Sequence, residues 1–251
     1  MVEEATECRA GAKKDGFYPD PKETLGVEPY IYISQYPQLY SGVDKNGCPL
    51  FISKPGVLNV TGISCITKLN GILKYHWHAM MHDFKERLQG QKKIDPHNFT
   101  RFECTTVLDL DGLSTSAVTK LALRIIQEQS QIDSLCFPET LSRMVIINAP
   151  RVFSVTWSLI KGWLDPRTIS KVDLISSRSS WEKKLKELVD EDQLPSDYGG
   201  KAEDTRTTMM KDAPSEIKRL FTKIFSFRYV IIVFNLNILI YLTDYVLKHF
   251  H

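Results

Sequence analysis

The chain has 251 residues and a formal net charge of +2, with 43% hydrophobic and 25% charged residues. This length suffices for one large domain or for a domain with extensions, and the composition is that of an ordinary globular protein. Because the charge is nearly balanced, the chain has no strong positive field, and we expect no nucleic-acid partner.

The cysteines and the N-terminus favour a cytoplasmic protein. Five cysteines are scattered along the chain, without the spacing of metal ligands, which favours reduced thiols in the cytosol. Residues 1–16 are charged and contain no apolar run of the kind found in secretory signals. We expect residues 1–29, which are polar with glycine and proline, to form a loose leader.

A hairpin connection and a long helix are predicted before residue 101. PLFIS at 49–53 has the composition of a strand, and the preceding SGVDKNGCP carries the Asn-Gly pair typical of a tight connection. Over 63–89, apolar residues recur at steps of three and four, which predicts a helix. Its histidines His76, His78 and His82 invite a metal site. Since their neighbours are core-like and no fourth ligand lies nearby in the sequence, we expect neither a metal nor a cofactor.

Strands and helices alternate from residue 105 to residue 189. TTVLDLD (105–111), RMVIINA (143–149) and KVDLIS (171–176) have the composition of buried strands, and a helical pattern follows each of them. Such alternation is typical of βαβ units and a largely parallel sheet. The predicted fold class is therefore α/β, with a mixed, largely parallel sheet flanked by helices.

Two predicted helix starts carry side chains suited to a phosphate group. Ser114 and Ser116 follow the strand at 105–111, and Ser180 follows the strand at 171–176 with Lys183 one turn further on. Helix N-termini offer free N–H groups and the positive end of the helix dipole, to which hydroxyls and an ammonium group add. Capping by serine explains the same residues and is commoner, so the residues alone favour capping.

The helix predicted after Pro150 is apolar around most of its circumference. Its polar positions, Ser154, Ser158 and Lys161, form one narrow stripe. A surface helix has a single apolar stripe, so this helix requires apolar partners on two sides. It is either fully buried in a large core, or a lid with the sheet on one side and lipid or membrane on the other. The apolar side chains concerned are Phe153, Val155, Trp157, Leu159, Ile160, Trp163 and Leu164.

Residues 30–201 resemble the CRAL-TRIO lipid-binding domain, and most of all the phosphatidylinositol/phosphatidylcholine transfer proteins. The resemblance rests on CFPETLSRMVIINAPRVFSVTWSLIKGWLDPRTISKV, on LPSDYGGK, and on the upstream segments YPQLYSGVDKNGCPLFIS and VLDLDGLSTSAV. It implies a sheet that forms the floor of a deep apolar lipid pocket, closed by a mobile lid helix, here residues 151–168.

The resemblance also implies roles for individual residues. Ser114 and Ser116 match the positions at which the family contacts the phosphate of a choline phospholipid, and Ser180 and Lys183 match those for phosphatidylinositol. It implies a protein without catalytic residues that moves a phospholipid, or another hydrophobic small molecule, between membranes. We expect a monomer that is cytoplasmic and associates peripherally with the membrane surface.

Other functions remain open at this point. The chain could be a membrane-attached adaptor that senses lipid without transferring it, or a truncated product without function. Asp109 and Asp111 suggest a carboxylate pair, but strand termination before Gly112 is the better explanation. No nucleophile lies beside a base in the sequence, so we expect no enzyme.

After the domain come a charged linker at 202–228 and an apolar tail at 229–247. The tail is long enough to span a bilayer, although Asp244 is costly in that setting. It could instead pack on the domain, because FNLNI at 234–238 alternates like a strand, or it could be the artefact of an altered C-terminus. We favour membrane association, as a C-terminal anchor, over packing.

Overall fold

The structure is a computed structural model that describes residues 2–14, 20–94, 102–114, 118–151, 153–215 and 217–218. The chain divides into two compact units, Met1–Met209 and Met210–His251. No helix among the described residues is long and apolar enough to cross a membrane. The predicted tail at 229–247 lies outside the described residues, as do 216 and 219–228 of the predicted linker.

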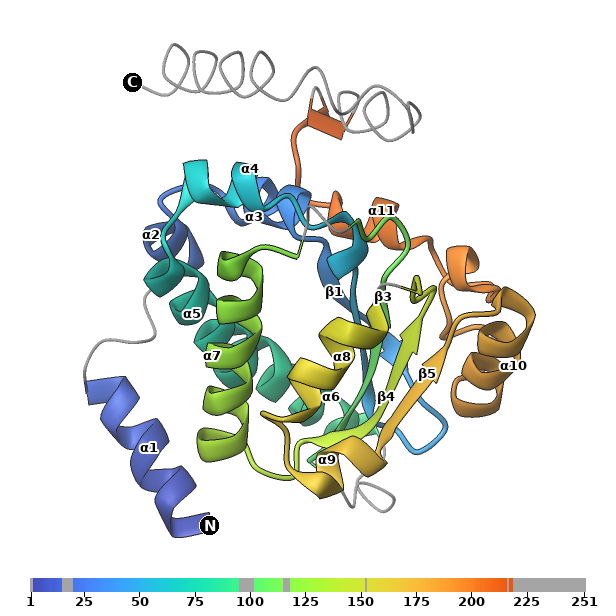
Figure 1. Cartoon of the computed structure of the whole chain (residues 1–251), viewed down its shortest axis with the longest axis horizontal. Helices are drawn as coiled ribbons and strands as arrows, with labels where there is room; N and C mark the ends of the chain where they lie inside the picture. The colour runs from blue at the N-terminus through green and yellow to red at the C-terminus, as the bar shows by residue number, and fades with distance from the viewer. Residues whose placement is uncertain are drawn as a thin grey trace. The chain divides into compact units, whose positions relative to one another are not determined.

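A five-stranded sheet forms the core of this unit, and its strands lie in chain order (Figure 1). β1 pairs antiparallel with β2, whereas β2, β3, β4 and β5 are all parallel. The prediction of a mixed, largely parallel sheet is therefore confirmed. The strands are β1 (Gln38–Val43), β2 (Pro49–Ser53), β3 (Cys104–Asp109), β4 (Leu141–Ile147) and β5 (Val172–Ile175).

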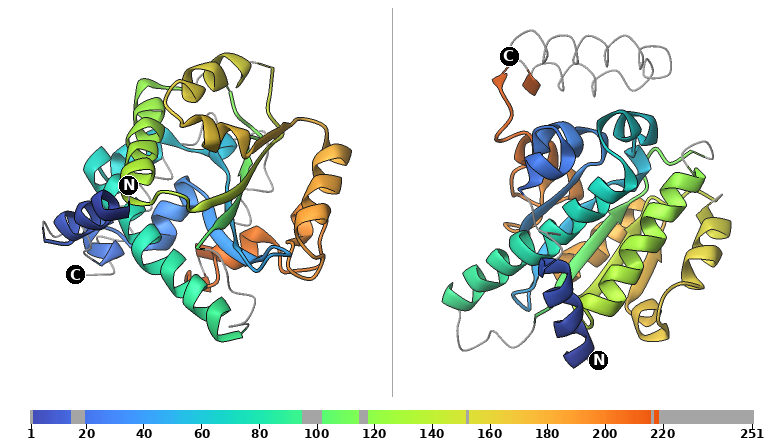
Figure 2. Two further views of the ribbon diagram at one scale, coloured as in Figure 1. Left: turned by 90° about the horizontal axis from the view of Figure 1, so that it is seen from below. Right: turned by 90° about the vertical axis from the view of Figure 1, so that its left-hand side faces the viewer.

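Helices cover both faces of the sheet. α10 (Arg178–Leu188) lies on one face, and α7 (Lys120–Cys136) and α8 (Phe153–Lys161) lie on the other (Figure 1; Figure 2, left). Successive side chains of a strand point to opposite faces, so both faces of a central strand must be apolar. In β4, Val145 and Ile147 pack in the cluster under α10, and Met144 and Ile146 pack in the cluster under α8.

The predicted loose leader differs from the structure, which has helices at α1 (Val2–Lys14) and α2 (Pro21–Leu25). The Asp20 side chain accepts a hydrogen bond from the Lys22 amide, and Gly26 ends α2 in the left-handed conformation at φ 72°. Leu25 is fully buried in a cluster with residues from α3 (Pro29–Gln35) and α5 (Leu69–His78). Because residues 1–29 are mostly polar, their composition did not indicate that a few apolar residues would anchor short helices there.

The single helix predicted over 63–89 is divided into several helical pieces. α4 (Val60–Ile66) ends where Thr67 takes an extended conformation, and a π-helical turn, Ala79–Asp83, separates α5 from α6 (Phe84–Ile94). α4, α5 and α6 each contain buried apolar residues, so the apolar spacing continues across the breaks; these residues are Ile63, Ile72, Trp77, Phe84 and Leu88. Spacing alone therefore gave no signal for them.

The expectation of reduced thiols is wrong for two of the five cysteines. The structure joins Cys8 of α1 to Cys136 at the end of α7 by a disulfide bond, 128 residues apart in the chain. Cys48 and Cys104 are buried and lie outside any disulfide, and Cys65 is exposed. A pairing between distant residues depends on tertiary structure, so the sequence spacing did not indicate it.

Candidate functional site

α8 has a buried side and an exposed apolar side. Phe153, Trp157 and Ile160, spaced by four and three residues, are each under 10% exposed. Val155 and Leu159 on the outer side are 69% and 53% exposed. Of the two alternatives for this helix, full burial in a large core is therefore wrong, because two large apolar side chains face outwards.

The inner side of α8 packs in one apolar cluster between the sheet and α7. The buried members are Phe153, Trp157 and Ile160 from α8 with Leu110 and Ile146 from the sheet side. Trp163 and Leu164, in the turn after α8, are partly buried against the same cluster, as is Ile126 of α7. Five of the seven predicted lid residues thus line one apolar interior, and the other two lie outside it.

Ser154, Ser158 and Lys161 make their side-chain contacts within residues 151–161, not with the sheet. The Ser154 hydroxyl donates to the Arg151 carbonyl oxygen at 2.9 Å, and the Ser158 hydroxyl donates to the Ser154 carbonyl oxygen at 3.0 Å. The Lys161 ammonium lies 5.4 Å from the Trp157 ring centroid. Such local contacts leave apolar packing as the main attachment of α8 to the sheet.

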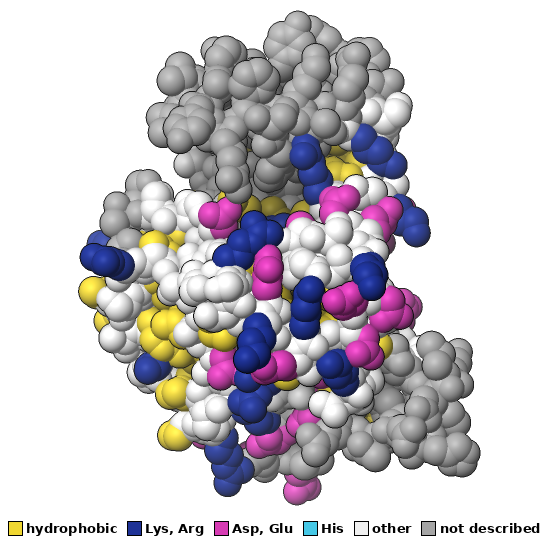
Figure 3. Space-filling view, turned by 90° about the vertical axis from the view of Figure 1, so that its right-hand side faces the viewer, with side chains coloured by type: hydrophobic (Ala, Val, Ile, Leu, Met, Phe, Trp, Pro, Cys, Tyr) yellow, Lys and Arg dark blue, Asp and Glu magenta, His cyan; other side chains and the backbone are white. Residues whose placement is uncertain are grey.

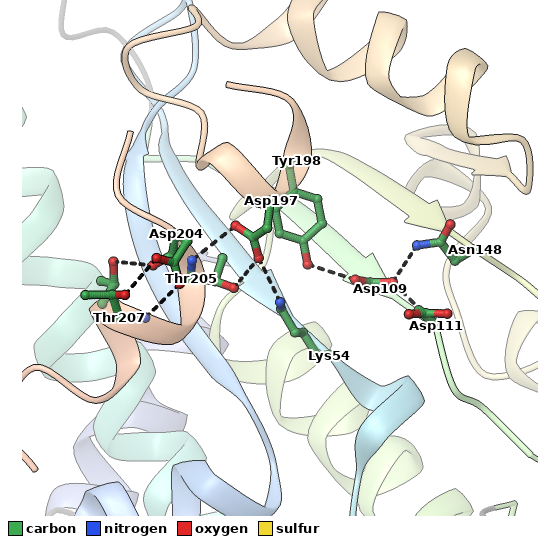
Figure 4. A network of polar contacts seen from close by, with 10 residues as sticks. Lys54, Asp109, Asp111, Asn148, Asp197, Tyr198, Asp204, Thr205 and Thr207 are labelled. Carbon is green, nitrogen blue, oxygen red and sulfur yellow. Dashed lines mark hydrogen bonds and ion pairs between the residues drawn. The ribbon is translucent and has the colours of Figure 1, made fainter. Parts of the chain in front are cut away.

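A partly buried polar network lies at the carboxyl ends of β3 and β4 (Figure 4). The Asp109 carboxylate accepts hydrogen bonds from the Tyr198 hydroxyl at 2.9 Å, the Asn148 amide at 2.8 Å and the Asp111 backbone N–H at 3.0 Å. The Trp181 indole of α10 donates to the Asn148 side-chain oxygen at 2.9 Å. Asp109 therefore ends β3 as a structural acceptor, as the sequence indicated, rather than as a reacting carboxylate.

Tyr198 donates because its hydroxyl stays protonated. Burial raises the pKa of Tyr198 well above its usual value, and the neighbouring Asp109 carboxylate raises it further. The Tyr198 ring also packs edge-on against Trp181 of α10. This tyrosine thus joins the end of β3 to the helix on the α10 face.

The backbone of the LPSDYGG segment, residues 194–200, makes that connection possible. Gly199 has φ 87°, and a Cβ atom on Gly200 would lie 1.8 Å from the Leu194 carbonyl oxygen. Asp197 pairs with Lys54 at 3.0 Å and accepts from the Thr205 backbone N–H at 3.1 Å at the start of α11 (Thr205–Met209). The positive φ of Gly199, the close approach at Gly200 and the hydrogen bond of Tyr198 all depend on the folded backbone, which the sequence alone does not show.

The predicted phosphate-binding residues lie at the carboxyl ends of the parallel strands. Ser180 and Lys183 are exposed in the first two turns of α10, and Ser114 is exposed after β3. Ser116 lies outside the described residues. Because these ends meet at the same edge of a sheet, Ser114 and Ser180 share that edge.

The helix start predicted at Ser114 and Ser116 is corrected by the structure. α7 begins at Lys120, and the Thr119 side chain caps it by accepting from the Ala122 amide at 3.1 Å. Ser114 is six positions upstream of that helix, beyond the reach of its free N–H groups. The run of serine and threonine offered several possible caps, and composition did not choose among them.

The three histidines have protein partners. His76 Nε2 lies 2.7 Å from an Asp133 oxygen of α7, and the rings of His78 and His82 are stacked at 4.7 Å. Burial lowers the pKa of His78, although Asp83 at 3.7 Å opposes this. Within the described ranges, the structure contains no group of three side chains able to hold a metal ion.

Comparison with known proteins assigns the class to which this fold belongs. The family model described as CRAL/TRIO domain matches residues 33–200. The chain therefore belongs to the CRAL/TRIO family, and the resemblance described above is confirmed. A crystal structure of Sfh5 aligns with a TM-score of 0.48 at 18% identity, covering 72% of this chain and 59% of that chain.

Among individual relatives, the phosphatidylinositol/phosphatidylcholine transfer protein SFH4 of Arabidopsis thaliana is 35% identical over 170 residues. That match covers 66% of this chain and 26% of SFH4. The SEC14 cytosolic factor of Eremothecium gossypii is 33% identical over 168 residues, covering 67% of this chain and 53% of that protein. The chain thus spans about a quarter to about half of the length of these relatives.

Proposed function

We propose that this protein binds one phospholipid in the apolar interior between α8 and the sheet and transfers it between membranes. Phosphatidylinositol and phosphatidylcholine are the proposed cargo, since the relative SFH4 is a phosphatidylinositol/phosphatidylcholine transfer protein. The observation that carries the proposal is the two-sided α8, whose inner side chains meet the sheet while Val155 and Leu159 face outwards. An apolar outer edge allows the lid helix to open against a bilayer.

The energetics favour exchange at a membrane over release into water. Each buried methylene contributes about 0.8 kcal/mol, so an acyl chain of about fourteen carbons gains on the order of 10 kcal/mol on leaving water. An interior as apolar as the bilayer makes the transfer between the two nearly neutral. The barrier that remains is the movement of α8, and no covalent step is needed.

The headgroup sites of the proposal are the residues at the carboxyl edge of the sheet. Ser180 and Lys183 would hold the phosphate of phosphatidylinositol, and Ser114 and Ser116 that of a choline phospholipid. A lysine ammonium and hydroxyl donors are suitable partners for a phosphate diester. Because Ser180 and Lys183 lie on α10 and α8 covers the other face, α8 can move without displacing them.

A protein of this function is not an enzyme, is monomeric, and associates peripherally with membranes from the cytoplasm. The alternative is a membrane-attached adaptor that senses lipid and retains it. Both would bind lipid, but only a transfer protein would deliver it.

The test is a transfer assay between two vesicle populations, one of which contains labelled phosphatidylinositol or phosphatidylcholine. The proposal expects label in acceptor vesicles at a rate proportional to protein concentration. Labelled lipid that binds to the protein without reaching acceptor vesicles would favour the adaptor. A chain that removes no lipid from donor vesicles would contradict both functions.

A further inference from the structure

A polar pocket lies at the amino ends of the parallel strands, at the edge of the sheet opposite the proposed headgroup residues. Its volume is about 460 Å³, within the range of small-molecule sites. Leu188, at the end of α10, lines it, and Ser180 lies eight residues earlier, or about 12 Å along the helix. The pocket is therefore separate from the proposed headgroup residues. Its polar lining includes Asp44, Thr105, Ser142, Arg143 and Lys171.

A β-bulge shapes this pocket. Cys104 of β3 pairs with Leu141, and Thr105 pairs with Arg143, so β4 contains one extra residue, Ser142, at this point. Bulges redirect side chains and occur often beside functional sites. Here Ser142 and Arg143 both line the pocket instead of alternating between the faces of the sheet.

Two cations lie side by side here. Met144 of β4 pairs with Val172 of β5, so Arg143 and Lys171, which precede them, are neighbours on adjacent strands. Like charges in this position repel. Lys171 donates to the Leu141 carbonyl oxygen at 2.6 Å and pairs with Glu139 at 3.3 Å. Arg143 is partly buried and has no partner among the residues that the structure describes.

The third charged group of the pocket, Asp44, is held in place by the fold. Its carboxylate accepts from the backbone amides of Asn46 at 2.8 Å and Cys48 at 2.9 Å, and from the Thr105 hydroxyl at 2.7 Å. A carboxylate has about four acceptor positions, so one is left for a hydroxyl group of a ligand. Two cations and one fixed carboxylate match a molecule that carries both phosphate and hydroxyl groups.

We propose that this pocket binds a water-soluble phosphorylated polyol. The Arg143 guanidinium and the Lys171 ammonium hold its phosphate, and Asp44 accepts from a ligand hydroxyl. The planar guanidinium of arginine binds phosphate through two parallel hydrogen bonds, and Arg143 is positioned for this by strand β4. A lipid headgroup has the same chemistry, but Leu188 is the one apolar residue among those lining the described pocket. Acyl chains would have nothing to contact there.

The experiment is isothermal titration calorimetry of the full chain with myo-inositol 1-phosphate, with inorganic phosphate and unphosphorylated inositol as comparison ligands. The proposal expects saturable binding of the phosphate ester at one site per chain. Arg143→Gln weakens this binding by about tenfold or more, because it removes charge-assisted hydrogen bonds. The matched control Arg124→Gln, at an exposed position of α7, leaves it unchanged.

A second measurement guards against a folding defect. Since Arg143 has no partner in the described fold, Arg143→Gln keeps the melting temperature of the ligand-free chain, whereas the rise in melting temperature caused by the phosphate ester is lost. Absence of saturable binding, or equal binding by Arg143→Gln, contradicts the proposal. So does loss of binding in Lys183→Ala, which would place the ester at the start of α10.

The lipid alternative has its own readout. If Arg143→Gln reduces phosphatidylinositol pickup from vesicles and the soluble ester does not bind, the pocket holds a lipid headgroup and our assignment is wrong. Transfer activity and ester binding are measured separately. Failure of the proposed transfer function therefore leaves the test of this pocket intact.

Discussion

α8 and α10 cover opposite faces of one sheet, and they are attached to it in different ways. α10 buries Trp181 and Leu185 and is linked to the sheet through Asn148, and ion pairs such as Arg178–Glu182 lie on its surface. Figure 3 shows Lys, Arg, Asp and Glu side chains of both signs over this side of the molecule. α8 is held by apolar packing and exposes Val155 and Leu159.

The difference indicates which side of the sheet can move. A polar network constrains geometry, because each broken hydrogen bond leaves a buried group without its partner. Apolar packing is less directional, so it imposes fewer such penalties when it is rearranged. In the proposed function, the α10 side is therefore the fixed half of the domain, and α8 is the half that we expect to open.

The largest expected effect is on the fixed half. Gly200→Ala places a methyl group against the Leu194 carbonyl, so we expect a loss of more than about 4 kcal/mol in the free energy of unfolding, measured by urea denaturation. The control is Gly90→Ala in α6, where a Cβ would contact nothing within 4 Å and helix propensity predicts a gain of about 0.5–1 kcal/mol. Equal stabilities for the two variants would contradict the account of the LPSDYGG segment.

The next effect concerns the proposed headgroup residues on α10. The double variant Ser180→Ala, Lys183→Ala should reduce phosphatidylinositol pickup to background and spare phosphatidylcholine, because it removes the ammonium and hydroxyl donors from one site only. Pickup of each lipid from vesicles is the measurement. An equal loss of both lipids would mean that the protein does not have separate headgroup sites.

The movable half is tested on its outer surface. Val155→Glu with Leu159→Glu should weaken binding to vesicles by about a hundredfold, since burying each side chain contributes about 1.5–3 kcal/mol. The matched control is Ser154→Glu with Ser158→Glu, which adds the same charge to exposed polar positions of the same helix. Vesicle co-sedimentation measures both. If the two pairs behave alike, charge rather than the apolar edge governs membrane binding.

The smallest expected effect comes from removing a single hydrogen bond on the α10 side of the sheet. Tyr198→Phe removes one donor from the buried Asp109 carboxylate, and we expect a loss of about 1.5–3 kcal/mol in the free energy of unfolding. Lipid transfer by the folded protein should be unchanged. Thermal denaturation with Tyr30→Phe as control separates this bond from a general effect of losing a hydroxyl. A loss equal to that of the control would mean that the Tyr198–Asp109 hydrogen bond does not stabilise the fold.

The central sheet could be predicted because its strands are buried on both faces and therefore form continuous apolar runs. The strand predicted at 49–53 has those limits in the structure. The apolar excess of α8 was also visible, but whether Val155 and Leu159 face protein or solvent depends on the neighbouring elements. The sequence left those two alternatives equal, and only packing separated them.

The features that escaped prediction depend on contacts between distant residues. The Cys8–Cys136 bond and the contact of Gly200 with Leu194 each require the folded backbone. The cap at Thr119 was hidden among several equivalent residues. Ser180 and Lys183 are where the sequence placed them, on the first turns of α10, but their role in holding a phosphate stays a prediction.

The most direct measurement of the central claim is native mass spectrometry of the full chain after incubation with phosphatidylinositol and phosphatidylcholine vesicles and re-isolation. The account predicts a mass increase of one phospholipid per chain, and a lower bound fraction for the Val155→Glu, Leu159→Glu variant. A chain that remains free of lipid at every vesicle concentration would contradict an interior built for a phospholipid.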